Sequence, residues 1–596
     1  MIRSVVICAA SVCLCVCGLA GAQPVVTVPR IEMPRPGTPL PPRDTSARPP
    51  SETPTVGTAS MSGRVVSAEN GQPLRRATVT AMPSRPPEMQ RGGVFVPPRQ
   101  FSARTDNDGR YRIAEMPAGE YLLTARRSGY AQQGYGQVGP NTPARRMTLA
   151  DGASLNTLDF SLMRAGVITG RVVDDEGEPA ERTQVRLVRR QRIGGQMRTF
   201  PLGMGDTTDD QGHYRLYGVM PGEYYVMAEP GDRFMFNNPM VQGAGTDTVP
   251  TYAPGTADVG EAQKVEVTAG GETPVDIQLI ASKVASVRGQ ILTSRGEPFV
   301  GGMVRLQSRS GDSMGIGRGG AVMADGKFEI GGVAPGSYIL IVQPSMMRDP
   351  GEMAAADLEG ATQPVSVEGE DITVAVRTTL GSTAKGRVIF EGADTSQLAN
   401  RELRVQGQPI GEFMSYFMGP IRRGVVQPDH TFEVVGLRGT MALWLNALPE
   451  NWWVKDIRMN GQSILDGHDF ASGRAFSGVE IVVSGRATGI NGTVSKPSGG
   501  NASDYAVVLF PEEEDRWERL GPNQMGPRAI RPDLDGAFKM PGLRPGNYFV
   551  LAVPAEQADM QQLQEPEQLR LLAAKARTVE VKDGVMSPVS LTLVER

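Results

Sequence analysis

Apolar and polar residues alternate in several short segments of the chain, and each of these segments follows a glycine-containing turn. Tyr224, Val226 and Ala228 occupy every second position of one segment, and the same spacing recurs at 338–342 and 548–552. A period of two is typical of an antiparallel strand that buries one face. The pattern therefore predicts an all-β chain of short strands joined by tight turns.

Three short phrases recur in the same order along the chain. The first is a glycine before a β-rich run, at Gly63, Gly170, Gly289, Gly386 and Gly492. The second is an Asp-containing turn that ends in glycine and an aromatic residue, at 106–111, 209–214, 324–328 and 533–538, with a weaker version at 428–432. The third is a glycine two positions before a tyrosine that opens an alternating strand, as at 119–121, 222–224, 336–338 and 546–548. Five repeats of about 100 residues are the size of single β-sandwiches.

These repeats divide the chain into predicted segments. We expect a signal peptide at 1–22, a Pro-rich disordered linker at 23–58, and β-sandwiches at 59–164, 165–283, 284–382, 383–486 (divergent) and 487–596. The last sandwich differs from the others because residues 556–577 contain no glycine. Leu569, Leu572 and Ala573 there have helical spacing, and Pro566 suits the first turn of a helix. One short helix is therefore expected inside the last module.

The order of the three phrases resembles the carboxypeptidase regulatory-like domain over about residues 59–596. The resemblance is strong in units one, two, three and five, and weaker in unit four, which has Gly439-Thr440-Met441 in place of Gly-x-Tyr. It implies tandem seven-stranded antiparallel sandwiches of the prealbumin (transthyretin-like) type, found in secreted proteins. Such modules carry no catalytic residues of their own. Related starch-binding-like sandwiches make carbohydrate an implied ligand class.

Composition agrees with exported, turn-rich material. The chain of 596 residues has 72 Gly and 46 Pro and a formal net charge of −4, which gives no general attraction to nucleic acid. Arg3, the apolar run to Ala20 and the Ala20-Gly21-Ala22 site have the form of a cleaved signal peptide. All four cysteines lie within this segment, so disulfides and thiolate metal sites are not expected in the remaining chain. No later stretch is long and apolar enough for a transmembrane helix.

Catalytic motifs are present only in contexts that do not suit them. His430 and Glu433 match the H-x-x-E zinc pair of metallocarboxypeptidases, but His430 falls at the turn position that glycine holds in other units. Residues 311–315 match G-x-S-x-G, but the glycines that follow cannot open the helix of a nucleophile elbow. A secreted carboxypeptidase or esterase is therefore a minor alternative, and no cofactor is expected.

Two sets of residues remain as candidates for binding. Asp106, Asp108, Asp209 and Asp210 could supply oxygen ligands to calcium, although the same residues suit a turn capped by aspartate. Exposed aromatic rings could stack on sugars, and Trp452, Trp453, Trp517 and Tyr135 are the candidates, with packing between modules as the alternative. Because neighbours on a strand face opposite ways, one of Trp452 and Trp453 should enter the core while the other faces outward.

The sequence therefore predicts a non-catalytic, exported, multi-module binding or scaffold protein. Its partner would be a protein or polysaccharide of the cell envelope or extracellular space, in the periplasm or outside the cell. Carbohydrate binding through exposed aromatics is the main alternative.

Overall fold

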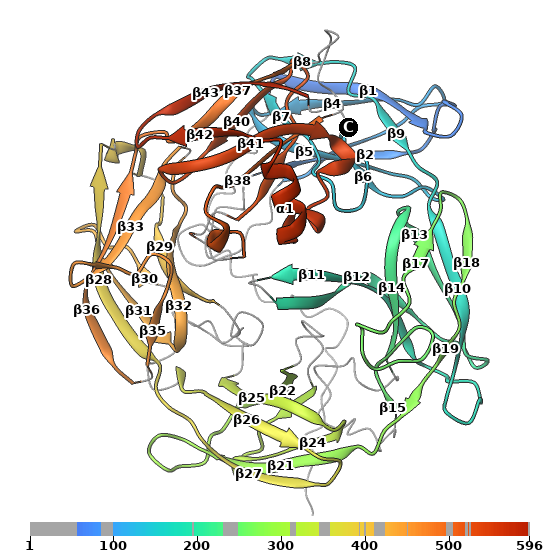
Figure 1. Ribbon diagram of the computed structural model, residues 1–596, viewed down its shortest axis with the longest axis vertical. Coiled ribbons are helices and arrows are strands. Elements are labelled where there is room, and N and C mark those ends of the chain that lie inside the picture. The colour runs from blue at the N-terminus through green and yellow to red at the C-terminus, as the bar shows by residue number, and fades with distance from the viewer. Residues whose placement is uncertain are drawn as a thin grey trace, which may run out of the picture. The chain divides into compact units, whose positions relative to one another are not determined.

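The structure is a computed structural model that describes residues 57–84, 99–193, 196–229, 248–309, 318–344, 358–392, 394–398, 401–410, 424–449, 451–471, 473–495, 505–518, 523 and 526–593. The predicted signal peptide and residues 23–56 of the predicted Pro-rich linker lie outside these residues, as does the G-x-S-x-G motif. Nearly all of the described regular structure is β-strand (Figure 1). None of its helices has the length and apolar character that crossing a bilayer requires.

The strands form five successive sandwiches of two main sheets each, which we call modules 1 to 5, and module 2 has a further two-stranded sheet, β15-β20. Module 1 contains β1 (Ala59–Ser67), β2 (Thr78–Pro83), β3 (Phe101–Arg104), β4 (Arg110–Met116), β5 (Gly119–Arg126), β6 (Gln133–Gly134), β7 (Arg146–Leu149), β8 (Ser154–Leu155) and β9 (Phe160–Leu162). Module 2 contains β10 (Gly166–Val173), β11 (Gln184–Ile193), β12 (Gln196–Thr207), β13 (His213–Val219), β14 (Gly222–Glu229), β15 (Thr248–Val249), β16 (Thr251–Tyr252), β17 (Val265–Val267), β18 (Glu272–Pro274), β19 (Ile277–Gln278) and β20 (Ile280–Ala281). Module 3 contains β21 (Ala285–Leu292), β22 (Gly302–Ser308), β23 (Arg318–Ala321), β24 (Lys327–Val333), β25 (Gly336–Pro344), β26 (Ala361–Val367) and β27 (Ile372–Arg377).

The last two modules carry additions to this plan. Module 4 contains β28 (Ser382–Glu391), η2 (Thr395–Leu398), β29 (Arg404–Pro409), β30 (Gly424–Val425), β31 (Thr431–Leu437), β32 (Gly439–Asn446), β33 (Trp453–Met459), β34 (Gln462–Ser463), β35 (His468–Phe470) and β36 (Ala475–Ser484). Module 5 contains β37 (Gly489–Ser495), β38 (Tyr505–Pro511), η4 (Glu514–Arg516), β39 (Arg528–Ile530), β40 (Ala537–Pro541), β41 (Gly546–Pro554), η5 (Ala555–Gln557), η6 (Gln562–Gln564), α1 (Pro566–Ala573), β42 (Arg577–Val581) and β43 (Met586–Thr592). The domain boundaries themselves stay a prediction.

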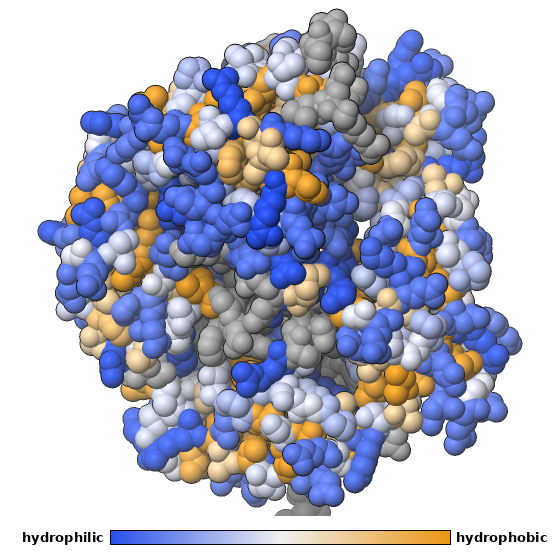
Figure 2. Space-filling view, viewed as in Figure 1, coloured by the Kyte–Doolittle hydropathy of each residue, from blue (hydrophilic) through white to orange (hydrophobic). Residues whose placement is uncertain are grey.

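The tandem β-sandwich fold is confirmed, with seven strands in modules 3 and 5. In module 3 one sheet has the order β24-β21-β27 and the other β23-β22-β25-β26. Each module has a core cluster of buried apolar side chains. Hydrophilic residues cover much of the surface in Figure 2, and hydrophobic residues appear as separate patches. The apolar cores inside the modules therefore hold the fold together.

One part of the fold prediction is wrong, because the sandwiches are not purely antiparallel. The closing strand of each module lies parallel to its opening strand, as β27 does along β21 from Val287↔Ile372 to Leu292↔Arg377. The same pairing joins β9 to β1, β19 to β10, β36 to β28 and β43 to β37. Two strands separated by a whole module have no local turn to force them antiparallel, so nothing nearby in the sequence indicates their direction.

This parallel pairing explains the recurring glycine of the opening strand. A Cβ atom on Gly289 would lie 2.0 Å from the carbonyl oxygen of Val374, and one on Gly492 would lie 1.7 Å from that of Val589. The corresponding glycines of the other modules, Gly63, Gly170 and Gly386, meet a carbonyl oxygen of the closing strand or of the residues just before it within 2.2 Å. Only a residue without a side chain allows the two strands this approach.

The recurring tyrosine forms the same hydrogen bond at the strand corner in four modules. The hydroxyl groups of Tyr121, Tyr224, Tyr338 and Tyr548 each donate to the backbone oxygen four residues earlier, at 2.6–3.0 Å. In module 4 the position holds Met441, whose Sδ accepts from the N–H of Arg438 at 3.4 Å. The divergent module thus keeps the corner with a weaker acceptor in place of a hydroxyl donor.

The helix expected in the last module is present as α1, with Pro566 in its first turn. Leu569 and Leu572 are buried against Ala506, Val508 and Phe510 on the outer face of β38. This helix lies beside β38 and β41 in Figure 1. Module 5 therefore has a second apolar cluster, which explains why every residue of β38 is buried.

A β-bulge lies between the opening strand and its antiparallel neighbour in modules 1 to 4. Its positive-φ position holds Gly218, Gly332 and Gly436 in modules 2 to 4, but Glu115 (φ 57°) in module 1. Left-handed backbone costs a residue with a Cβ about 1–2 kcal/mol. We therefore expect Glu115→Gly to raise the free energy of unfolding of module 1 by about 1 kcal/mol.

This gain in the free energy of unfolding can be measured by chemical denaturation of the full chain, with hydrogen exchange of peptides from 57–165 as the readout for module 1. Glu115→Ala is the control, because it removes the same side chain and keeps the strain. Equal effects of the two substitutions would contradict the explanation.

Candidate functional site

All four aromatic candidates for sugar stacking are buried, so the hypothesis of exposed rings at these positions is wrong and the alternative of packing holds. Trp452, Trp453, Trp517 and Tyr135 keep 8%, 6%, 4% and 7% of their surface exposed. Tyr135 packs edge-on against Phe160 in the core of module 1. Trp517 lies under α1 and donates its Nε1–H to the Pro511 carbonyl oxygen at 2.7 Å. Each of these rings removes a large apolar area from water when it is buried, which favours an interior position.

The prediction that Trp452 and Trp453 face opposite ways agrees with the structure. Trp452 belongs to the core of module 4, whereas Trp453 lies outside that core cluster, at the joint with module 5. An outward tryptophan could stack on a sugar or pack between modules, and Trp453 packs between modules.

The Asp-containing turns are closed by their own aspartates. Oδ1 of Asp106 accepts from the backbone N–H groups of Asp108 and Arg110 at 2.9 and 2.8 Å, and Oδ1 of Asp209 accepts from those of Gln211 and His213 at 3.0 and 2.7 Å. These bonds lower the pKa of Asp209, with the His213 backbone N–H as the largest contribution. Gly109 and Gly212 take the expected positive φ. The carboxylates of Asp108 and Asp210 accept none of these turn bonds. The described residues contain no group of three or more acidic, His or Cys side chains placed to hold a metal.

His430 occupies the turn position predicted for it, with φ 66°. Its ring packs edge-on against Phe390, and Glu433 on β31 forms an ion pair with Lys385 at 3.4 Å. The H-x-x-E pair is thus part of a turn and a strand in this module.

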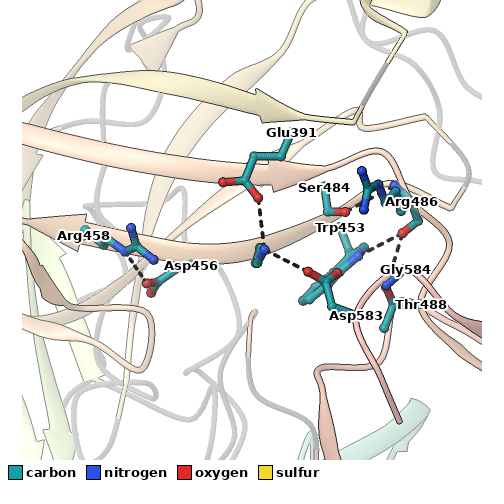
Figure 3. Close-up of polar contacts among 10 residues, drawn as sticks. Glu391, Trp453, Asp456, Arg458, Ser484, Arg486, Thr488, Asp583 and Gly584 are labelled. Atoms are coloured by element: carbon teal, nitrogen blue, oxygen red, sulfur yellow. Dashed lines mark hydrogen bonds and ion pairs between the residues drawn. The ribbon is translucent and has the colours of Figure 1, made fainter.

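Module 4 is joined to module 5 by a network that begins with Trp453 (Figure 3). The indole Nε1–H of Trp453 donates to the carbonyl oxygen of Arg486 at 3.1 Å, in the segment between the modules. The Thr488 hydroxyl donates to the same oxygen at 3.3 Å and accepts from the N–H of Gly584 at 2.9 Å. A tryptophan of module 4, the connecting segment and the β42–β43 turn of module 5 therefore share one chain of hydrogen bonds.

Lys455 adds a charged link to the same joint. It is the extra residue of a bulge in β33, because Val454 pairs with Val483 and Asp456 with Val482. Its ammonium lies 2.8 Å from Asp583 of module 5 and 3.0 Å from Glu391 of module 4. Hydrogen bonds to Asp583 and then Glu391 raise the pKa of Lys455, so it stays charged at neutral pH. Bulges re-aim a side chain, and this one directs Lys455 across the joint.

The strand that carries Trp453 and Lys455 is an addition to the module. Module 4 extends one sheet to the order β31-β28-β36-β33-β34, whereas the matching sheet of modules 3 and 5 has three strands. Asn460 and Gly461 form the turn of the added hairpin, with φ 51° and 79°. The Asn-Gly pair is a strong hairpin signal that the sequence analysis missed.

Modules 3 and 4 are joined by a partly buried arginine, Arg438. The Arg438 guanidinium donates to the carbonyl oxygens of Leu358 and Thr379 (the latter at 3.0 Å), and Leu358 packs against Val435. Burial lowers the pKa of Arg438 to about 10, and the charge of Glu359 opposes this fall. Arg438 therefore remains charged at neutral pH.

Glu359 is the buried carboxylate of this joint. Burial alone would raise its pKa, but hydrogen bonds from the Ser294 and Thr378 hydroxyls and from the Ser294 N–H at 2.9 Å give a net fall. A lowered folded-state pKa contributes stability above the unfolded value of about 4.3. That contribution is expected to be lost as the pH falls through the folded-state pKa.

Hydrogen exchange of peptides around 294 and 358–379, measured from pH 7 downward, checks this expectation. Glu359→Gln should reduce protection at pH 7 and flatten its pH dependence. The same acid response in both proteins would contradict the role of Glu359.

A pocket of about 430 Å³ opens at one end of module 4. It lies where β36 runs past the end of β33, and its lining includes His468, Arg474, Phe476 and Asn460. None of these residues was a candidate from the sequence. The added hairpin supplies Met459 and Asn460 to the pocket, so the Asn460-Gly461 turn was also the signal that could have located it.

Comparison with known proteins agrees with the resemblance drawn from the repeats. Residues 60–163 match the family model of the carboxypeptidase regulatory-like domain. A comparison with curated proteins finds no match.

Solved structures similar to the chain are tandem or single β-domain proteins of low identity. The minor pilin of Streptococcus agalactiae is 13% identical, with 37% of this chain and 96% of that chain covered and a TM-score of 0.21. Two B repeat units of the Staphylococcus aureus collagen-binding protein are 10% identical, covering 71% and 98%, with a TM-score of 0.13. A putative carbohydrate-binding protein of Pseudomonas aeruginosa is 19% identical, covering 19% and 92%, with a TM-score of 0.12. These values are too low to transfer a ligand or partner.

Proposed function

We propose that the chain is a non-catalytic, exported scaffold whose β-sandwich modules present binding surfaces in the cell envelope or extracellular space. The observation that carries the proposal is the joining of adjacent modules by side-chain networks. Trp453 and Lys455 link modules 4 and 5, and Arg438 links modules 3 and 4. A chain built for spacing needs such joints, because a bare flexible linker would let each module move independently.

Further bonds across the last joint support this role. Arg544 of module 5 forms an ion pair with Asp466 of module 4 at 3.0 Å, and Lys539 donates to the Asn451 side-chain oxygen at 3.2 Å. A single exposed ion pair contributes little stability. At this joint several of them act together with the buried hydrogen bond of Trp453.

Hydrogen exchange of the full chain, without the predicted signal peptide, tests the proposal at residues 484–489. The Arg486 N–H donates to the Ser484 hydroxyl at 3.2 Å and the Gly489 N–H to the Val585 carbonyl oxygen at 3.1 Å. These two amides should exchange as slowly as neighbouring strand amides. Exchange at the rate of an unstructured peptide would overturn the scaffold.

The catalytic alternative needs its own measurement. Zinc analysis together with a panel of chromogenic esters and peptides should give no bound metal and no turnover. Turnover by the purified chain would overturn the non-catalytic proposal, whatever the state of the joints. The binding partner is expected to be a protein or a polysaccharide.

A further inference from the structure

The pocket in module 4 has an aromatic floor. The rings of His468, Phe470 and Phe476 contact one another edge-on, with centroids 5.1–5.5 Å apart. Phe470 is fully buried, whereas His468 and Phe476 are partly exposed and line the pocket. The floor therefore offers one apolar ring, Phe476, that is reachable from solvent and held edge-on by its two neighbours, and a flat ring can stack on such a side chain.

The rim of the pocket is polar and carries both signs of charge. Asn460, Asp469 and Arg474 are exposed there, and Ser477 adds a hydroxyl. Among the described residues, neither Asp469 nor Arg474 forms an ion pair with another side chain. The opposite charges of these two residues cancel, so the rim does not select strongly for a charged ligand.

The loop that carries Arg474 is held in place from beneath. The buried Ser382 hydroxyl donates to the Ala471 carbonyl oxygen and accepts from the Arg474 N–H at 3.2 Å. The Arg474 carbonyl oxygen accepts from the Thr383 N–H at 2.9 Å. A rim fixed in this way loses less conformational entropy on binding a ligand than a free loop would.

A backbone edge lies open beside the floor. The pairing of β33 with β36 ends at Met459↔Val479, so residues 475–477 of β36 have no strand on that side among the described residues. Backbone N–H and C=O groups that face this open side, away from β28, can pair with ligand hydroxyls. The pocket thus combines an aromatic floor, side-chain donors and acceptors, and a volume in the range of small-molecule sites.

We propose that this pocket binds one ring of an uncharged sugar, with its apolar face on the Phe476 ring and its hydroxyls on Asn460, Asp469 and Arg474. This assignment deepens the proposed scaffold role and rests on it, because it takes the chain to hold its ligand without converting it. It also moves the carbohydrate hypothesis away from the buried tryptophans to a place that only the added hairpin of module 4 creates.

Saturation-transfer difference NMR of the full chain with methyl glycosides of glucose, galactose, mannose and N-acetylglucosamine tests the proposal. At least one uncharged glycoside should give a saturation-transfer signal, and that signal should level off as the glycoside concentration is raised. Asn460→Gly removes the side-chain amide while keeping the positive φ of the turn, and Arg474→Ala removes an exposed guanidinium. Each substitution should lower the affinity for the glycoside about tenfold, which is the loss expected for one or two hydrogen bonds.

Arg387→Ala is the matched control, because Arg387 is an exposed arginine of the same module that pairs with Glu480 on β36. It should leave glycoside affinity unchanged. Saturation of none of the glycosides would overturn the proposal, and so would equal affinity in all three variants. Binding of glucuronate or inorganic phosphate in place of the glycosides would overturn the uncharged class.

These results can be distinguished from those that test the scaffold. If no glycoside binds while the amides of residues 484–489 still exchange slowly, the sugar site is overturned and the scaffold proposal is not. Hydrolysis of a bound glycoside would overturn the non-catalytic role while leaving the site in place.

Discussion

Replacement of Gly289 by alanine is expected to unfold module 3 or to weaken it by about 3 kcal/mol or more. The new methyl group would lie 2.0 Å from the Val374 carbonyl oxygen and 2.9 Å from the Phe328 ring. A carbonyl in a paired strand cannot move aside without breaking the parallel pairing of β21 with β27. Hydrogen exchange of peptides from 285–377 of the full chain would report the loss.

Gly331→Ala is the matched control in the same module. The nearest atom to a Cβ at Gly331 is the Ser286 hydroxyl oxygen, 4.0 Å away. This substitution should change stability by less than about 0.5 kcal/mol. Similar exchange in both variants would show that the opening glycine is not required by the closing strand.

Trp453→Ala is expected to uncouple module 5 from module 4. The substitution removes a buried ring and its bond to the Arg486 carbonyl oxygen, which together should cost about 3 kcal/mol at the joint. Amides of residues 484–489 and of Gly584 should then exchange faster. The core of module 4 should keep its protection, since Trp453 is not part of that cluster.

Two further variants allow the effect of Trp453→Ala to be compared with a smaller and a different loss. Trp453→Phe keeps most of the ring and loses the indole donor, so its effect should be about 1 kcal/mol. Trp452→Ala removes a ring from the core of module 4 and should make the amides of that module exchange faster. Unchanged exchange at 484–489 in Trp453→Ala would mean that the joint does not depend on this residue.

The repeats, the tyrosine corners and α1 could be predicted because their signals are local. The Asp-containing turn, the Gly-x-Tyr phrase and the spacing of Leu569 and Leu572 each lie within a few residues of the structure they specify. The direction of the closing strand could not be predicted, since β27 and β21 are about eighty residues apart in the chain.

Burial of the aromatic candidates depended on surfaces that the sequence does not place. Trp517 is covered by α1, and Trp453 lies against the segment that leads into the next module. The pocket of module 4 could not be predicted for a related reason. It arises between a strand that runs on, β36, and an added strand, β33, that stops at Met459.

The parallel pairing of first and last strands sets how each module responds to tension. The chain enters along one strand and leaves along its neighbour in the same direction, so a pull on the two ends draws these strands past each other lengthwise. In module 5 the ladder from Gly489↔Met586 to Ser495↔Thr592 would then be loaded across all its hydrogen bonds together, not peeled open one by one. Each module is thereby arranged to resist stretching forces such as those of flow or an anchored surface.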